Sequence, residues 1–408
     1  MDKTISSKQI LGELLSRHYE EAFEAKTAGE LVAWSTSIAP QELLETMNIK
    51  VVYPENHAAV IGARKDAQAF LDNAENNGYS MDLCSYARVN IGYMNLKKSV
   101  AGNIPMPDFI FCCNNICNTV IKWYENLARE MHIPMILIDM PFNHTDEVPD
   151  YSVKYIRGQF EYAILQLEGI TGKKFDREHF QEVMKISAQT ARWWKKATAL
   201  AAAQPSPFNG FDLFNYMAVI VCMRGKQEGL DLFKLWAEEL QEKIDRGEGP
   251  WKDQKEKYRI MWDGIACWPH LADTSRILKK NGINMVTSTY PDSWTIVYDS
   301  DDLDAMARAY TSNYVNRNLD YGINKIVQIL KDFSLDGIIY HSNRSCKLMD
   351  FRQYEVQRQV QEQTGVASVM FDGDQTDPRA FSLAQYEIRI QALMEIMEQR
   401  KNERPSEQ

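Results

Sequence analysis

The chain has 408 residues, a length that suits two domains of ordinary size better than one core. Hydrophobic residues make up 45% of it and charged residues 25%, the proportions of a soluble globular protein. A formal net charge of −10 argues against nucleic-acid binding, which needs a basic stripe. A local basic pocket for a phosphorylated small molecule remains compatible with that charge, because net charge says little about single sites.

The start of the chain, residues 1–15, lacks the apolar core of a signal peptide. The longest apolar runs, such as Met217–Met223, are far shorter than a membrane span. We therefore expect a cytoplasmic protein that does not enter a membrane. Because disulfides are rare in the cytoplasm, the seven cysteines are expected to be free thiols, thiolates or metal ligands.

Short apolar runs rich in β-branched residues alternate with longer helical patterns. The predicted strands, in chain order, are residues 49–53, 108–113, 134–139, 259–267, 283–289, 337–341 and 367–371. Runs that are apolar throughout, rather than alternating with polar residues, are typical of parallel strands covered on both faces. An amphipathic helix is predicted around residues 154–168. Residues 176–247 contain no good strand and are predicted to be wholly helical, with breaks at 204–207 and 247–250.

Alternating strands and helices predict βαβ units and therefore an α/β fold. We expect two domains, each with a small parallel sheet flanked by helices, plus a helical connecting segment. The N-terminal α/β domain is predicted to span residues 1–172. The remainder, 173–408, is predicted to begin with the helical segment 173–250 and to continue as a C-terminal α/β domain.

Polar stretches follow several of the predicted strands, and two of them contain a cysteine. Cys117 follows strand 108–113, and Cys346 follows strand 337–341. In open parallel sheets, ligands bind outside the carboxyl ends of the strands. The two thiols are therefore predicted to face one another across a cleft between the domains.

The seven cysteines differ in their surroundings. Four lie in apolar segments and are interpreted as small buried hydrophobic residues: Cys112, Cys113, Cys222 and Cys267. Cys84 and Cys346 stand among polar residues and are harder to explain by packing, while Cys117 could face the core of the helix that it begins. The spacing of Cys84, Cys117 and Cys346 matches no compact zinc or ferredoxin motif.

A metal site on these three thiols therefore stays open at this point, as does a catalytic thiol paired with His57 or His341. The sequence contains neither a G-x-x-x-x-G-K-[ST] loop nor a G-x-G-x-x-G loop, so neither ATP nor a dinucleotide has an obvious binding motif.

Along essentially its whole length the chain resembles the larger subunit of the 2-hydroxyacyl-CoA dehydratases. The stretches that carry the resemblance are Trp34–Ser37 (WSTS), Tyr53–Ala59 (YPENHAA), Ser85–Asn90 (SYARVN), Cys112–Glu130 (CCNNICNTVIKWYENLARE), Asn343–Met349 (NRSCKLM) and Asp372–Arg379 (DGDQTDPR). Together these stretches are highly specific, although no single one of them would be.

Carried over position by position, the resemblance implies that Cys84, Cys117 and Cys346 bind a 4Fe–4S cluster whose fourth iron has no protein ligand. It also implies that Ser37 and Glu55 are catalytic residues beside that iron. Without the resemblance, Ser37 would be interpreted as an ordinary hydroxyl hydrogen-bonded to the backbone, and Glu55 as an exposed carboxylate. The implied reaction is elimination of water from an (R)-2-hydroxyacyl-CoA through a ketyl radical, giving the 2-enoyl-CoA. A one-electron reduction is needed because no side chain has a pKa suited to taking the unactivated C3 proton directly.

The resemblance further implies a smaller β subunit in a heterodimer and a separate ATP-dependent iron–sulfur activator protein. Within the family, the motifs are most like those of members that convert lactoyl-CoA to acryloyl-CoA, namely Asn143–Thr145, Trp262–Ile265, Trp268–Leu271 and Thr376. Two other functions stay open: an aromatic acyl-CoA reductase subunit, and a non-catalytic subunit that carries a cluster and relays electrons.

Overall fold

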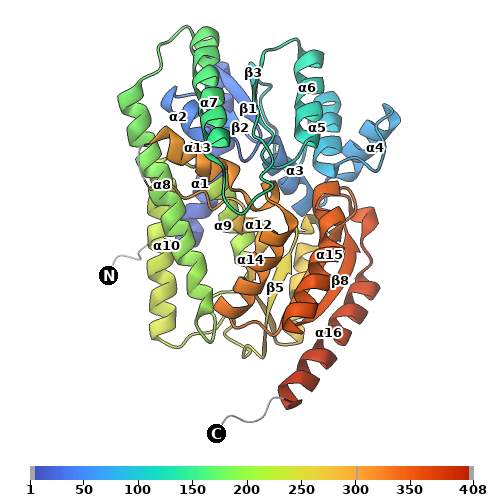
Figure 1. The fold of residues 1–408 in the computed structure, drawn as a ribbon. Coiled ribbons are helices and arrows are strands. Elements are labelled where there is room, and N and C mark those ends of the chain that lie inside the picture. The colour runs from blue at the N-terminus through green and yellow to red at the C-terminus, as the bar shows by residue number, and fades with distance from the viewer. Residues whose placement is uncertain (1–4, 300–301, 404–408) are drawn as a thin grey trace.

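Two four-stranded parallel sheets, each flanked by helices, form the framework of the computed structural model, which describes residues 5–299 and 302–403 (Figure 1). The α/β class and the two parallel sheets predicted from the sequence are confirmed. In Figure 1 the first sheet lies above the second, and the long helices α8 and α10 lie along one side.

The first sheet has the strand order β2-β1-β3-β4, and all its neighbouring strands are parallel. Its strands are β1 (Val32–Ser35), β2 (Lys50–Val52), β3 (Phe109–Cys113) and β4 (Met135–Ile138). The helices of this half are α1 (Ser7–Thr27), α2 (Gln41–Thr46), α3 (Pro54–Ala63), α4 (Gln68–Asn76), α5 (Ser85–Leu96), α6 (Thr119–Met131) and α7 (Asp150–Thr171). Helices α1, α6 and α7 pack on the sheet, and all five residues of β3 are buried, as expected for a strand covered on both faces.

The second sheet has the order β6-β5-β7-β8 and is also parallel. Its strands are β5 (Tyr258–Asp263), β6 (Ile283–Ser288), β7 (Gly337–Asn343) and β8 (Ala367–Gly373). Its helices are α11 (Leu271–Lys280), α12 (Thr289–Asp292), α13 (Leu303–Thr311), α14 (Leu319–Asp332), α15 (Lys347–Thr364) and α16 (Leu383–Glu403). Helices α11, α15 and α16 pack against its strands.

The segment between the sheets is helical, as predicted, and consists of α8 (Arg177–Ala199), a short 3-10 turn, α9 (Phe211–Cys222) and α10 (Gln227–Asp245). It packs on both halves: α8 contacts α2, α9 and α10 contact α1, and the 3-10 turn contacts β6. The segment therefore bridges the two sheets rather than extending one of them.

Two strand predictions were wrong in detail. Strand β1 was missed because its sequence, VAWS, contains only one β-branched residue and does not read as an apolar β-branched run. Strand β5 was predicted to reach Cys267 but ends at Asp263, because Gly264 adopts a φ of +102° that turns the chain. None of the helices in the described residues is both long and apolar enough to cross a membrane.

Candidate active site

Ser37 and Glu55 are brought together by two neighbouring strands. Ser37 lies in the turn that follows β1, and Glu55 is the second residue of α3, directly after β2. Pro54 occupies the first position of that helix, where its missing N–H costs nothing. The Ser37 backbone N–H donates to Glu55 Oε1 at 3.1 Å, and the Ser37 hydroxyl donates to the same oxygen at 3.4 Å.

Glu55 is 7% exposed, so its carboxyl group is almost completely removed from water. Its second oxygen, Oε2, accepts a hydrogen bond of 2.7 Å from the hydroxyl of Tyr124 on α6. Burial raises the pKa of Glu55, and the hydrogen bonds from Tyr124 and Ser37 offset only part of that rise. The carboxyl group therefore holds a proton to a higher pH than an exposed glutamate does.

Cys117 lies in the loop between β3 and α6, past the end of its strand as predicted, although α6 begins only at Thr119. The side chain of Asn115 fixes this loop by donating to the carbonyl oxygens of Ile38 and Tyr310, both at 3.1 Å. One of these carbonyls belongs to the Ser37 turn and the other to α13. The loop that carries Cys117 is thus tied to both halves of the molecule.

Cys84 and Cys346 are held near one another by their neighbours in the sequence. Cys84 precedes α5 and Cys346 precedes α15. The Ser85 backbone N–H donates to the Ser345 hydroxyl at 3.0 Å, which joins the two loops. The Gln375 amide donates to Cys84 Sγ at 3.1 Å, so the loop after β8 also reaches this thiol.

These side chains surround one cavity of about 110 Å³. All five predicted site residues line it: Ser37, Glu55, Cys84, Cys117 and Cys346. Most of the remaining wall is apolar or aromatic, with Val120 and Trp123 from the first half and Tyr290 and Trp294 from the second. The cavity lies where loops at the carboxyl ends of strands from both sheets meet, the usual position of a ligand site in parallel α/β folds.

The three thiols have little to stabilise them as thiolates. Burial raises the pKa of Cys84 to about 12 and raises the pKa of Cys117 and Cys346 as well. No lysine, arginine or histidine is among the described residues that line the cavity. A bound metal would supply the positive charge that favours the ionised form of these sulfurs.

Within residues 5–299 and 302–403, no three His, Cys, Asp or Glu side chains form a group that could hold a metal ion. A 4Fe–4S cluster is a larger body, and each thiolate ligand binds a different iron of the cube. Three half-buried thiols around one cavity are therefore compatible with a cluster, although they do not form a single-ion site.

Neither histidine considered as a partner for a catalytic thiol faces these cysteines. His57 Nε2 is 2.9 Å from the carbonyl oxygen of Gly102, and His341 Nδ1 is 2.6 Å from that of Ile265. The four cysteines interpreted as core residues are all buried: Cys112, Cys113, Cys222 and Cys267.

Two residues of the site were not singled out from the sequence. Tyr124 contacts Glu55, and Gln375 contacts Cys84. Both lie inside stretches that carried the family resemblance, 112–130 and 372–379. The motifs could have drawn attention to them, but their contacts depend on how distant segments pack.

The fold and the cavity define an α/β protein with two parallel sheets, whose candidate active site combines thiols from both halves with a buried carboxyl group of raised pKa. Comparison with known proteins identifies the family. The family model described as "2-hydroxyglutaryl-CoA dehydratase, D-component" matches residues 36–397. The chain therefore belongs to the 2-hydroxyacyl-CoA dehydratase family, as an α subunit of these hydro-lyases.

Three relatives match almost the full length of the chain. It is 50% identical to the (R)-2-hydroxyisocaproyl-CoA dehydratase α subunit of Clostridioides difficile, over 98% of each chain. It is 46% identical to the (R)-phenyllactyl-CoA dehydratase α subunit of Clostridium sporogenes, over 97% of this chain and 96% of the relative. It is 45% identical to the lactoyl-CoA dehydratase subunit α of Anaerotignum propionicum, over 97% of each.

Proposed function

We propose that the chain binds a 4Fe–4S cluster through Cys84, Cys117 and Cys346 and removes water from an (R)-2-hydroxyacyl-CoA to give the 2-enoyl-CoA. The observation that carries the proposal is that three thiols from both halves line one cavity with the hydrogen-bonded pair Ser37 and Glu55. When bound, such a cluster supplies one electron to the thioester carbonyl and recovers it at the end of the cycle, so the reaction has no net redox change.

Ser37 and Glu55 supply the proton chemistry in this proposal. The Ser37 hydroxyl can donate a hydrogen bond to a substrate oxygen in the cavity. In this proposal Glu55 starts the cycle in its protonated form, which burial favours by raising its pKa, and gives its proton to the hydroxide that leaves C2. The resulting carboxylate takes the proton from C3 after the radical has made that position acidic. Water leaves, and Glu55 returns to its starting state.

The acyl side chain is proposed to be uncharged and apolar. A glutaryl group would place its free carboxylate in a cavity whose described lining contains no lysine, arginine or histidine, and an unpaired buried charge is costly. Lactoyl-CoA, with a single methyl group, is the substrate that the sequence motifs predict. The smaller partner subunit and the ATP-dependent activator belong to the proposal as well, together with cytoplasmic location.

The test begins with the cluster. Protein purified without oxygen, together with its partner subunit, should contain iron and sulfide that are lost when Cys346 is replaced by Ala. Cys222→Ala is the matched control, because Cys222 is buried in α9 away from the cavity and should keep the iron. Full iron content in the Cys346→Ala protein would contradict the proposal.

Glu55→Gln and Ser37→Ala should keep the iron but lower turnover by about a hundredfold to ten-thousandfold, the usual effect of losing a proton-transfer group. Turnover is measured with the activator, ATP and a reductant, on lactoyl-, 2-hydroxyisocaproyl-, phenyllactyl- and 2-hydroxyglutaryl-CoA. Net consumption of electrons per turnover would instead indicate an acyl-CoA reductase. Iron without activity on any substrate, in the presence of the partner, would indicate an electron relay.

A further inference from the structure

Tyr290 lines the candidate active site from the second half of the molecule, whereas Ser37 and Glu55 line it from the first. The residue belongs to α12, directly after β6. Its ring packs edge-on against Trp294, with the two ring centroids 4.8 Å apart, and this contact fixes the ring in place. Nothing in the proposed chemistry uses the phenol group of Tyr290.

Tyr290 differs from the other hydroxyl groups that the second half contributes to the cavity wall. Thr289 donates to the carboxyl group of Asp263 at 2.7 Å, and Tyr314 donates to the same group at 3.5 Å. Ser293 donates to the backbone carbonyl oxygen of Thr289 at 3.1 Å. A hydroxyl group has one hydrogen, so each of these three has already used its hydrogen inside the protein.

The direction of the hydrogen bond between Tyr86 and Tyr290 follows from Trp268. The indole Nε1–H of Trp268 can only donate, and it donates to the Tyr86 hydroxyl at 2.5 Å. Among the described residues, the hydrogen of Tyr86 then has one acceptor, the Tyr290 oxygen, 3.4 Å away. Tyr290 therefore accepts from Tyr86 and keeps its own hydrogen for an acceptor in the cavity. In such a chain each hydrogen bond strengthens the next.

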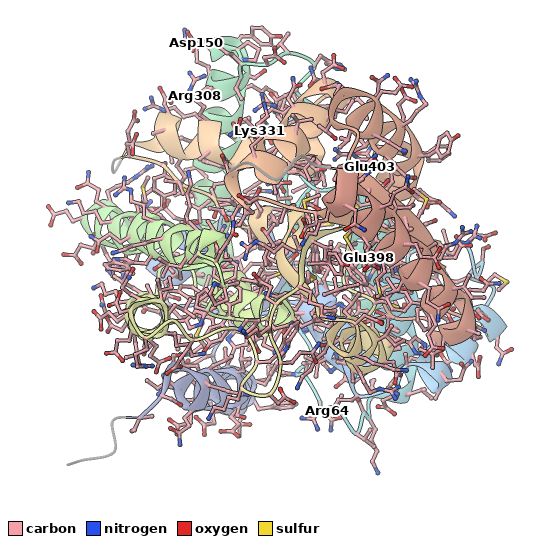
Figure 2. All side chains as sticks on the ribbon, turned by 90° about the horizontal axis from the view of Figure 1, so that it is seen from below. Arg64, Asp150, Arg308, Lys331, Glu398 and Glu403 are labelled. Atoms are coloured by element: carbon pink, nitrogen blue, oxygen red, sulfur yellow. The ribbon has the colours of Figure 1, made fainter. Side chains whose placement is uncertain are left out.

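The described wall of the cavity offers no cation to a negative charge. No lysine, arginine or histidine is among the described residues that line it, and Figure 2 shows charged side chains such as Arg64 and Asp150 at the outer edge of the molecule. Burial raises the pKa of Tyr290 and outweighs the opposing hydrogen bond from Tyr86, and the nearby carboxyl group of Glu55 acts in the same direction as burial. The phenol therefore keeps its hydrogen and is a neutral donor.

The proposed reaction places a negative charge on one substrate oxygen in this cavity. The thioester carbonyl oxygen becomes anionic when the carbonyl group accepts one electron, while Ser37 and Glu55 serve the hydroxyl group that leaves C2. In apolar surroundings, such a charge is costly unless a hydrogen-bond donor meets it. A donor that is already fixed in place stabilises the charge most effectively, because it needs no reorganisation during the reaction.

We propose that Tyr290 is a further catalytic residue, whose hydroxyl donates a hydrogen bond to the thioester carbonyl oxygen and stabilises the negative charge that this oxygen gains. Tyr86 is the positioning residue that directs the Tyr290 hydrogen into the cavity. The inference rests on the proposed function, because the charge arises only in that reaction. It places the thioester carbonyl between Tyr290 on one wall and the pair Ser37 and Glu55 on the other.

Tyr290→Phe keeps the ring and removes only the hydroxyl. With the partner subunit and the activator supplied, this variant should lower kcat by about a hundredfold to a thousandfold, the effect of losing one such donor, and should change KM by less than about threefold. Tyr86→Phe should lower kcat by about threefold to tenfold, because it removes the bond that directs the donor and leaves the donor itself. The matched control is Tyr340→Phe, since Tyr340 is a buried tyrosine of β7 outside the lining of the cavity and should keep the parent's kcat.

The infrared carbonyl stretch of a bound thioester provides a measurement that needs no turnover. The probe is propionyl-CoA with an isotope label at the carbonyl carbon, bound to the anaerobically purified complex before activation. Propionyl-CoA lacks the 2-hydroxyl group and cannot lose water. Because a hydrogen bond lowers the stretching frequency of a carbonyl group, the band should lie at higher frequency in Tyr290→Phe than in the parent or in Tyr340→Phe. All three tyrosine variants should contain as much iron as the parent, because none of them removes a candidate ligand.

An unchanged band in Tyr290→Phe would overturn the inference, even if kcat falls. If the band moves in Tyr290→Phe but the parent dehydrates no 2-hydroxyacyl-CoA, the contact with the carbonyl stands and the proposed reaction fails. If the parent dehydrates and Glu55→Gln does not, but Tyr290→Phe keeps both the band and kcat, the reaction stands and the role of Tyr290 is wrong.

Discussion

At the scale of single residues, Tyr124 can serve both protonation states of Glu55. Its hydroxyl oxygen lies 2.7 Å from Glu55 Oε2 and 3.1 Å from the carbonyl oxygen of Ser35. A phenol has one hydrogen, so it donates to one of these oxygens at a time. When Glu55 is ionised, Tyr124 donates to it. When Glu55 is protonated, Tyr124 can accept that proton's hydrogen bond and donate to Ser35, so neither state leaves a buried polar group without a partner.

Replacing Tyr124 by Phe should therefore change the pH dependence of turnover. The Tyr124 hydrogen bond lowers the pKa of Glu55, so its loss should raise that pKa further. Since the proposed cycle begins with protonated Glu55, activity is lost as pH rises through this pKa. The alkaline limb of kcat/KM against pH should move upward by about one to two pH units, because a hydrogen bond to a charged group contributes about 1.5 to 3 kcal/mol.

Tyr93→Phe is the control for this experiment, because Tyr93 is also buried and its hydroxyl donates to the carbonyl oxygen of Ile104 rather than to Glu55. It should lower stability and leave the limb in place. An alkaline limb that is unchanged in Tyr124→Phe, or displaced to lower pH, would contradict the assignment of Glu55 as the initial proton donor.

Residue-scale features differed in how far the sequence could predict them. Cys117 and Cys346 could be singled out because each follows a strand, and chain direction alone puts both at sheet edges. Cys84 could be singled out by its polar neighbours, whereas Ser37 and Glu55 came from the family resemblance. The partners Tyr124 and Gln375 could not be derived, because each reaches its contact across many residues and the rotation of α6 or the path of the loop after β8 decides it.

At the scale of elements, the loop after β8 holds the two halves together beside the cysteines. Asp377 of this loop accepts two hydrogen bonds of 3.2 Å from Arg88 of α5, and Arg88 also binds Glu75 of α4 at 2.6 Å. Arg88 is 1% exposed, so this ion pair is buried. Because α5 begins immediately after Cys84, Arg88 fixes the direction of the element that carries one candidate cluster ligand.

Arg88→Met should lower the free energy of unfolding by about 3 kcal/mol, the low end for breaking a buried ion pair. The loss stays at the low end because Arg379 still forms ion pairs with both Asp377 and Glu75. Arg276→Met removes an exposed ion pair with Asp273 and should cost about 1 kcal/mol or less. Thermal unfolding of the two variants, measured side by side, checks the difference. Equal losses would mean that the Arg88 contact contributes no more than a surface pair.

Element positions were mostly predictable because the strands are apolar throughout and lie between clear helical patterns. Of the eight strands in the described residues, seven overlap a predicted strand, and most of their ends lie within a few residues of the predicted ends. The missed strand, β1, carries the turn of Ser37, so the error fell beside the site. Residues 32–35 form a strand because they pair with β2 and β3, and such long-range pairing is not visible in the local sequence pattern.

At the scale of the whole molecule, buried polar groups join parts that the sequence could not place relative to one another. Glu42 of α2 is fully buried and accepts hydrogen bonds from Ser187 of α8, from Tyr298 and from Tyr310 of α13. The helical segment was predicted as helices, but its packing against α2 depends on such distant contacts. The relative arrangement of the two sheets therefore follows from tertiary interactions rather than from strand patterns.

Histidines whose pKa is lowered in the folded state should make the stability of the molecule depend on pH. Burial lowers the pKa of His18 and of His57 to about 4. In the unfolded chain each would have a pKa of about 6.5. Between about pH 6.5 and pH 4 the unfolded state therefore binds more protons, and stability must fall as pH falls through this window. Burial also lowers the pKa of His341, which adds in the same direction.

Glu55 opposes this trend, because its raised pKa makes the folded state bind the extra proton and costs stability as pH rises above about 4.5. Asp212, whose pKa burial also raises, acts in the same direction as Glu55, but the three histidines of lowered pKa named above outnumber these two carboxyl groups, so the midpoint of thermal unfolding should be lower at pH 5 than at pH 7. His57→Gln should reduce that difference, and Glu55→Gln should enlarge it, because each substitution removes one of the two opposing groups. The measurement is thermal unfolding of the parent and both variants at the two pH values. A parent that is more stable at pH 5, or variants that change the difference in the same direction, would mean that other groups govern the pH dependence.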